Sequence, residues 1–124
     1  MAEGIQTVIY PVKDLAKAKA LFRALLEVEP AVDEPNYVGF HVAGQDIGLD
    51  PHGHGRGMTG PVAYWHVNDI EDTVQTLLIA GAEEVEGVRD VGGGKLIATL
   101  KDADGNRIGL LQPVPPGQGA AADR

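Results

Sequence analysis

Four histidines are the side chains of this sequence that could carry out the widest range of chemistry. A neutral imidazole can bind a metal ion or act as a general base, because its ordinary pKa of about 6.5 lies near neutral pH. A pair formed by His66 and an aspartate could serve as such a base, but no spacing in the sequence requires it. Cysteine is absent, which excludes disulfides, thiolate metal sites and a cysteine nucleophile. The histidines are His41, His52, His54 and His66.

His52 and His54 form an H-x-H pattern in the glycine-rich run 51–61. A metal site there would need a third ligand, and Asp50 and His66 are the nearest candidates. No pattern fixes the geometry of these side chains, so the sequence favours a polar loop over a metal site. The run has almost no apolar side chains, which predicts a linker that could move as a flap. His41 lies in a predicted strand whose facing the sequence leaves open.

Several other functional classes are disfavoured by composition and motifs. The glycines at residues 92–94 do not belong to a phosphate-binding loop, and no nucleophile elbow is present. The formal net charge of −8 argues against binding to nucleic acids or anionic membranes. The sequence shows no signal peptide and no apolar run of the ~20 residues that a membrane helix needs. We therefore expect a soluble, cytoplasmic protein without nucleic-acid or membrane partners.

The elements that must position these residues come in two copies of one pattern. The string Val12-Lys13-Asp14-Leu15 matches Val67-Asn68-Asp69-Ile70, and each string ends an apolar strand. The string Ile47-Gly48-Leu49 matches Ile108-Gly109-Leu110, and a proline follows each shortly after. This repetition predicts two βαβββ units.

Helix and strand signals give the bounds of these units. Asp14 and Asp69 precede apolar residues at helical spacing, which predicts capped helices over about 15–26 and 70–80. The apolar stripe predicted for the first helix is Leu15, Ala18, Leu21, Phe22, Leu25 and Leu26. Strands are expected at residues 5–12, 37–42, 46–50, 62–67, 83–91, 95–100 and 107–112, with a turn-rich connector at 33–36 and a hairpin turn at 104–106.

The predicted organisation is a single domain of residues 1–113. Its first unit covers residues 5–50, the linker 51–61 and the second unit 62–113. Residues 114–124 are rich in proline, glycine and alanine, and they predict a flexible C-terminal tail.

This arrangement resembles the vicinal oxygen chelate superfamily, which includes glyoxalase I, extradiol dioxygenases, fosfomycin-resistance transferases and bleomycin-resistance proteins. The resemblance covers about residues 5–113. It rests on the two strand-to-helix junctions, the helix end A-G-A-E and the closing D-A-D-G-N-R-I-G-L, where Ala103 replaces the family's proline. It implies an α+β, glyoxalase-like fold in which two βαβββ repeats form an open, curved, eight-stranded mixed sheet around a cavity. One such scaffold hosts many functions, so the resemblance alone does not give the function.

Metalloenzymes of this family place one metal ligand on each of four strands. In the family these four ligands are usually a His, then a Glu, His or Gln, then a second His, and finally a Glu. The resemblance places them, in this order, at Thr7, Gly48, Val62 and Gly109. Glycine and valine have no donor atom, and a single threonine hydroxyl is a poor ligand. The resemblance therefore implies a member without a metal or another cofactor, to which the family's metal-assisted chemistry does not transfer.

Alternation along the strands predicts which side chains line the cavity. Tyr64 offers a ring and a hydroxyl, while His66 and Asp50 could hydrogen-bond a ligand. Gly48 and Gly109 would leave space for a small organic molecule. An alternative is that Tyr64 and His66 belong to the core or to a dimer interface. The predicted ligand-binding residues are Thr7, Asp46, Gly48, Asp50, Val62, Tyr64, His66, Arg107, Gly109 and Leu111.

Three hypotheses on function follow. The first is a homodimeric binding protein that sequesters a small aromatic or cationic molecule, such as an antibiotic. The second is a lyase or isomerase, either with non-standard metal ligands among His41, His52, His54 and His66 or with metal-free acid–base catalysis; its catalytic residues are unknown. The third is an accessory subunit whose cavity is filled by its own side chains.

Overall fold

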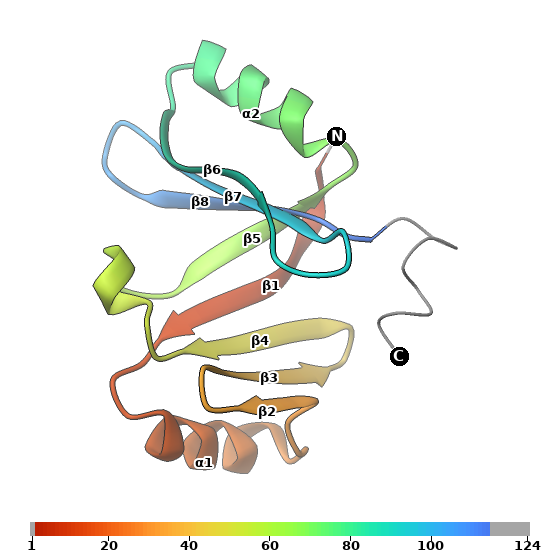
Figure 1. Cartoon of the computed structure of the whole chain (residues 1–124), viewed down its shortest axis with the longest axis vertical. Coiled ribbons are helices and arrows are strands. Elements are labelled where there is room, and N and C mark those ends of the chain that lie inside the picture. Colours follow the sequence, from red (N-terminus) through yellow and green to blue (C-terminus); the bar gives the residue numbers. More distant parts are fainter. Residues whose placement is uncertain (1, 115–124) are drawn as a thin grey trace. The chain divides into compact units, whose positions relative to one another are not determined.

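The computed structural model describes residues 2–114, and it shows two helices and eight strands (Figure 1). The elements run strand, helix and three strands, and then repeat that order. The strand order of the mixed sheet is β2-β3-β4-β1-β5-β8-β7-β6. The predicted α+β class with two βαβββ repeats is therefore confirmed. The predicted tail, apart from Val114, lies outside the described residues.

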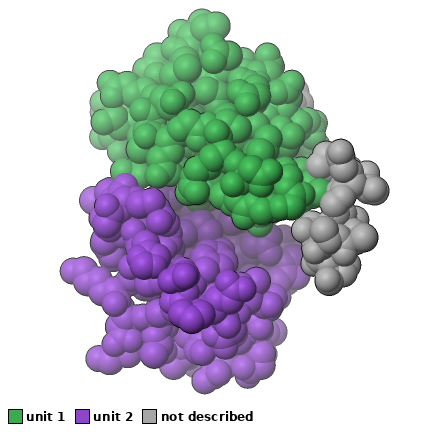
Figure 2. All heavy atoms as spheres, viewed as in Figure 1, with its two compact units in different colours: residues 1–5, 64–124 green, residues 6–63 purple. Residues whose placement is uncertain are grey.

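The chain divides into two compact units, which Figure 2 shows in different colours. Unit 1 takes in Met1–Ile5 and Tyr64–Arg124, and unit 2 takes in Gln6–Ala63. The run 51–61, predicted as a separate linker, thus groups with the first repeat. The grouping of residues 1–113 as one domain stays a prediction.

Unit 2 is a four-stranded mixed sheet with one helix. Its strands lie in the order β2-β3-β4-β1, with β1 parallel to β4 and the other neighbours antiparallel. Val38, Phe40 and Leu49 form its buried core. The elements are β1 (Ala2–Pro11), whose residues up to Ile5 belong to unit 1, α1 (Leu15–Leu26), β2 (Val32–Glu34), β3 (Tyr37–Val42) and β4 (Gln45–Asp50).

Helix α1 begins and ends where its local signals predict. The Asp14 carboxylate accepts a hydrogen bond of 3.0 Å from the backbone N–H of Lys17. At the other end Glu27 adopts φ 59°, and its N–H donates to the Arg23 carbonyl at 2.9 Å. Leu15, Ala18, Phe22 and Leu26 pack on the core, as predicted.

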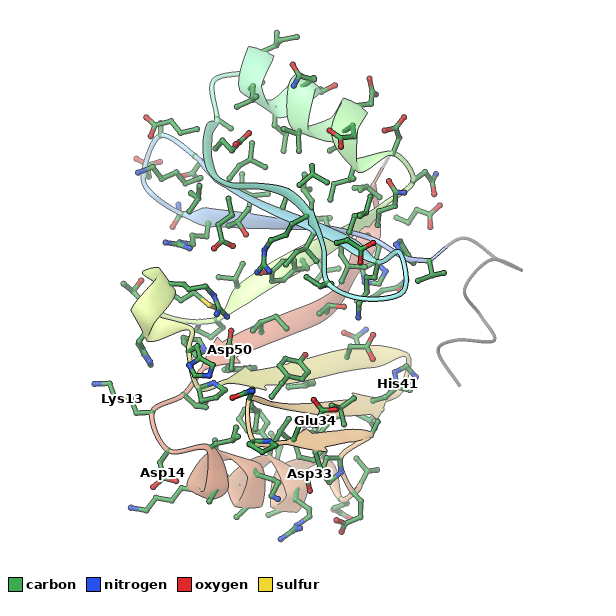
Figure 3. The ribbon with its side chains drawn as sticks, in the orientation of Figure 1. Lys13, Asp14, Asp33, Glu34, His41 and Asp50 are labelled. Atoms are coloured by element: carbon green, nitrogen blue, oxygen red, sulfur yellow. The ribbon has the colours of Figure 1, made fainter. Side chains whose placement is uncertain are left out.

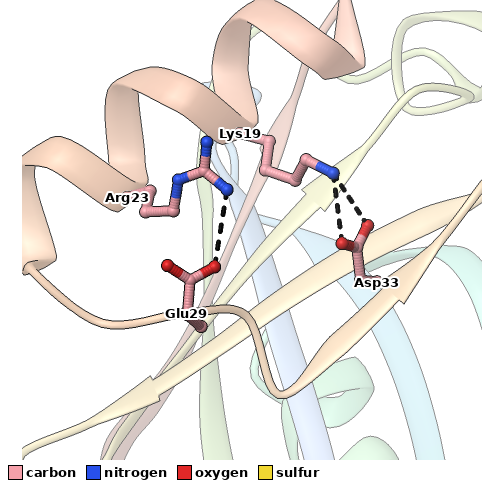
Figure 4. Close-up of polar contacts among 4 residues, drawn as sticks. All are labelled: Lys19, Arg23, Glu29 and Asp33. Atoms are coloured by element: carbon pink, nitrogen blue, oxygen red, sulfur yellow. Dashed lines mark hydrogen bonds and ion pairs between the residues drawn. The ribbon is translucent and has the colours of Figure 1, made fainter.

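Two leucines of the predicted stripe do not join the core. Leu21 and Leu25 are each 68% exposed, so the apolar face of α1 is narrower than the sequence pattern indicates. Two ion pairs link α1 to the segment that follows it at the surface (Figure 4). Lys19 pairs with Asp33 at 3.1 Å, and Arg23 pairs with Glu29 at 3.4 Å. Such exposed pairs stabilise only weakly.

Two segments predicted as irregular carry structure. The connector at 33–36 includes part of strand β2, which pairs with β3. The run 51–61 contains the 3₁₀ turn η1 (His54–Arg56) and a methionine, Met58, that is 7% exposed. The run has few apolar side chains, as the sequence shows, but one of them is buried; that the run moves as a flap stays a prediction.

A two-residue turn joins β3 to β4. Ala43 and Gly44 have φ values of 54° and 76°, and they connect the paired residues Val42 and Gln45. Two positive φ angles in a two-residue loop are typical of a type I′ turn, which favours Asn-Gly. We expect Ala43→Asn to raise the free energy of unfolding by about 0.5–1 kcal/mol. Urea denaturation should show this gain, whereas Ala43→Val should lower stability; a loss with asparagine would contradict the prediction.

Unit 1 repeats the same topology. Its strands lie in the order β5-β8-β7-β6, with β5 parallel to β8 and the others antiparallel. Helix α2 begins at Asp69, whose carboxylate accepts from Asp72 N–H at 3.0 Å. The Gln112 side-chain oxygen also accepts from Ile70 N–H at 2.8 Å. The elements are β5 (Val62–Val67), whose residues up to Ala63 belong to unit 2, α2 (Ile70–Ile79), β6 (Glu83–Asp90), β7 (Leu96–Lys101) and β8 (Arg107–Gln112). The buried core is Val67, Ile70, Val74, Ala98, Leu100 and Leu110.

The closing hairpin is organised by Asp102, just before the predicted turn. One oxygen of its carboxylate accepts from the N–H groups of Asp104 and Asn106, both at 2.9 Å. The other oxygen accepts from the Asn106 side chain at 3.1 Å. These bonds favour the charged form, so they hold the pKa of Asp102 below its ordinary value of 3.8.

The hairpin gives a prediction on pH. The Asn106 side chain is the first cause of the lowered pKa, so Asn106→Ala should raise the pKa of Asp102 toward 3.8. A lowered folded-state pKa contributes stability above the unfolded-state pKa, and this contribution is lost as pH falls through the folded-state pKa. NMR titration of the Asp102 carboxyl carbon checks the pKa, and urea denaturation at decreasing pH checks the loss of stability. A wild-type pKa of 3.8 or higher would contradict the assignment.

Candidate functional site

One face of the unit 2 sheet gathers the first group of predicted ligand-binding residues. Thr7 on β1 lies opposite Asp46 on β4, and Ile9 lies opposite Gly48. Pro11 is the partner of Asp50 at the end of the same pair of strands. Because cross-strand partners share a face, Thr7, Asp46, Gly48 and Asp50 lie on one side of the sheet, as the alternation predicts. Thr7 is buried, and it does have an interaction partner.

A tyrosine that the sequence did not single out covers the middle of this face. Gly39 on β3 is the cross-strand partner of Gly48. A Cβ atom at Gly39 would lie 3.1 Å from Tyr37 Cε2, and one at Gly48 would lie 2.8 Å from Tyr37 Cζ. The ring therefore leans from its own strand across both glycines. The prediction that Gly48 leaves open space is wrong, because Tyr37 takes that space.

Asp50 organises the loop that follows its strand (Figure 3). Its side chain is only 10% exposed and forms an ion pair with Arg56. Its other oxygen accepts from the backbone N–H of His52 at 2.8 Å. Both oxygens of the carboxylate thus bind groups of the loop. This geometry gives Asp50 a structural role beside the predicted contact with a ligand.

His41 pairs with Asp46 at the other end of the face, and Figure 3 shows His41 where β3 ends. Their Nδ1 and Oδ1 atoms are 2.6 Å apart, and the side chains are 60% and 51% exposed. The two residues are cross-strand partners, so His41 faces the same side as Thr7. The sequence left this facing open, and only the register with Asp46 settles it.

The second group of predicted residues lies together in unit 1. Tyr64 pairs with Gly109, and His66 pairs with Leu111, along the parallel strands β5 and β8. All four are buried or nearly so, and Tyr64 and His66 both have interaction partners. Arg107 lies at the start of β8, opposite Lys101, and is half-buried. The remaining residue, Val62, is buried at the start of β5, in the part of that strand that belongs to unit 2.

The two loop histidines do not form a metal site with the residues proposed for it. His52 Nε2 lies 3.3 Å from the Asn36 side-chain oxygen, and His54 is exposed in η1. Within residues 2–114, no three side chains of His, Cys, Asp or Glu come together in an arrangement that could hold a metal ion.

The residues at the four metal-ligand positions of the family do not fit a metal ion. Thr7 and Val62 are buried, and valine offers no donor atom. At Gly48 a new side chain would start 2.6 Å from Ile9 Cδ1 and would meet the Tyr37 hydroxyl. Gly48 thus lacks a donor atom, and its surroundings leave no room for a side chain that would carry one. We therefore derive no chemistry through a metal ion.

Tyr37 is the residue of this face that sequence reasoning missed. A signal for it does exist in the chain. Gly39 lies two residues after Tyr37, and an aromatic side chain often covers a neighbouring glycine within a sheet. The pairing of Gly39 with Gly48 is long-range information, however, and it appears only once the register is known.

Comparisons with known proteins agree with this architecture. The model of the Glyoxalase/Bleomycin resistance protein/Dioxygenase superfamily matches residues 4–110. No curated protein matches the sequence significantly. Neither helix among the described residues is long and apolar enough to cross a bilayer.

Solved structures with the same fold come from several bacteria. A superfamily member from Vibrio splendidus 12B01 is 17% identical, with 90% of this chain and 98% of that one covered and a TM-score of 0.67. Methylmalonyl-CoA epimerase from Mycobacterium tuberculosis is 21% identical, with coverages of 92% and 90% and a TM-score of 0.68. The Mn(II)-bound glyoxalase from Novosphingobium aromaticivorans is 18% identical, with coverages of 91% and 40% and a TM-score of 0.69. At these identities the solved structures show the fold alone. The family model, by contrast, matches residues 4–110, which is most of the chain. The chain therefore belongs to the Glyoxalase/Bleomycin resistance protein/Dioxygenase superfamily.

Proposed function

We propose that this protein binds a small organic molecule on the face of the unit 2 sheet described above, without a metal ion at the family's ligand positions. The observation that carries the proposal is Tyr37 lying over Gly39 and Gly48. This arrangement places a phenol where a metal-binding side chain would project. An aromatic ring beside oriented polar side chains suits an organic ligand.

The proposal also covers the class of ligand, the use of its binding, and the oligomeric state and location of the protein. We propose an aromatic or cationic ligand, because the aromatic ring of Tyr37 lies on this face and the net charge of the chain is −8. Sequestration of an antibiotic would be one use of such binding. We also propose a homodimer in the cytoplasm. The unit 1 residues predicted to contact a ligand are Tyr64, His66, Arg107, Gly109 and Leu111.

A thermal-shift screen tests the proposal directly. The protein is screened against divalent metals and against small aromatic compounds of each charge. A ligand that binds only the folded state raises the midpoint of unfolding, so we expect shifts with organic compounds but none with metals alone. Metal analysis of protein purified without chelator is the complement. Stoichiometric metal that is lost in a His66→Ala variant would overturn the proposal.

Acid–base catalysis of an isomerase or lyase reaction is a second candidate function. The short contact between His41 and Asp46 on the same face favours it, because a carboxylate orients an imidazole for proton transfer. Exchange of an activated C–H hydrogen for deuterium, tested across small carbonyl compounds in D2O, would reveal such activity. His41→Gln should abolish the exchange, while His54→Gln in the exposed turn should retain it. Equal rates in both variants would contradict this function.

A further inference from the structure

The ring of Tyr37 is a supported aromatic surface. It rests on two glycines of adjacent strands, so no side chain from Gly39 or Gly48 stands between the ring and the sheet. The ring is neither fully buried nor free, since Tyr37 is half-buried and has an interaction partner. A ring fixed in this way presents its π face at little cost in conformational entropy.

A carboxylate stands beside this ring. Glu34 on β2 is the cross-strand partner of Tyr37, so both side chains lie on the same face. The preceding residue, Asp33, points to the opposite side, where it pairs with Lys19 of helix α1 (Figures 3 and 4). The alternation of the strand thus divides two neighbouring carboxylates between the two faces.

The other carboxylates on this face already have cationic or imidazole partners. Asp50 pairs with Arg56, and Asp46 pairs with His41. Glu34 is exposed, and within the described part of the chain its carboxylate forms no ion pair or hydrogen bond. Its charge is therefore available to a ligand that lies against Tyr37.

We propose that Tyr37 and Glu34 form a recognition site for a planar aromatic cation. The inference rests on the proposed binding function and names the class of its ligand. The ligand ring stacks on Tyr37, whose negative π face attracts its positive charge, and the Glu34 carboxylate adds a second attraction. Tyr37 and Glu34 are then the residues that set specificity for charge and shape.

Three planar probes of similar size test the inference: proflavine, a cation; acridone, which is neutral; and anthracene-2-carboxylate, an anion. Their dissociation constants are measured by fluorescence titration at low ionic strength. We expect proflavine to bind most tightly, and Tyr37→Leu to weaken it by about tenfold. Glu34→Gln should weaken proflavine by about threefold or more and leave acridone unchanged. Tyr37→Phe keeps the ring and should retain binding.

Asp33→Asn is the matched control, because it removes an equal charge from the opposite face of the same strand. It should leave all three dissociation constants unchanged. Equal losses of proflavine binding in Glu34→Gln and Asp33→Asn would overturn the inference, since only net charge would matter. A second outcome is that the wild-type protein binds organic compounds and that Tyr37→Leu, with a normal unfolding midpoint, binds them equally well. This outcome would overturn the inference and leave the proposed function intact. Absence of binding by every probe and every screened compound would overturn both.

Discussion

Replacing Gly53 by alanine is expected to lower the free energy of unfolding by about 1–3 kcal/mol. Gly53 opens the 3₁₀ turn after β4 and is buried there. A Cβ atom at this position would lie 2.7 Å from Pro11 Cβ, and 3.0 Å from both Pro11 Cα and Met58 Sδ. Because Pro11 Cα belongs to the backbone of a strand, relief requires a shift of the loop or of β1. Overpacking of this kind destabilises through strained contacts.

Because of the backbone conformation of Gly53, the Gly53→Ala variant tests only whether there is room for a Cβ atom. Its φ of −61° and ψ of −44° suit any residue, so alanine meets no conformational penalty. Gly55, two residues later in the same turn, is the matched control, because a Cβ atom there would have no neighbour within 4 Å. Gly55→Ala should therefore be neutral or slightly stabilising in urea denaturation. Equal stability of the two variants would contradict the close packing of Gly53 on Pro11.

The loop at 51–61 shows where sequence reasoning reached its limit. Its glycine content predicts flexibility, yet Met58 and the Asp50 carboxylate give it fixed contacts. One buried side chain leaves no periodic pattern, and an ion pair across six residues has no sequence signature comparable to a helix cap. By contrast, Asp14 and Asp69 cap helices where predicted, because a cap depends on residues three positions away.

The same contrast between local and long-range information holds for the candidate site. Alternation along each strand correctly placed Thr7, Asp46, Gly48 and Asp50 on one face. It could not show that Tyr37 would lean over Gly48, since that depends on how β3 pairs with β4. Leu21 and Leu25 illustrate a related error. Their helical spacing is right, but both are exposed, because only one part of the apolar stripe of α1 packs on the core.

The second large expected loss of stability comes from removing the Asp50 carboxylate. We expect Asp50→Ala to lower the free energy of unfolding by about 1.5–3 kcal/mol, because it leaves the His52 N–H without its acceptor and Arg56 without its partner. Asp50 is nearly buried, so its hydrogen bonds are poorly replaced by water. Arg56 is 42% exposed and can be rehydrated, which keeps the expected loss below that of a fully buried ion pair.

Conservative variants separate the two contributions of Asp50. Asp50→Asn keeps an acceptor for His52 N–H and removes the charge, so it should cost less than Asp50→Ala. Asp46→Asn on the same strand is the control: its partner His41 is exposed, and the expected change is within about 1 kcal/mol. Urea denaturation of the three variants gives the comparison. If Asp50→Ala were as stable as the wild-type protein, the loop would not depend on this carboxylate, and the buried charge of Asp50 would be better explained by contact with a ligand.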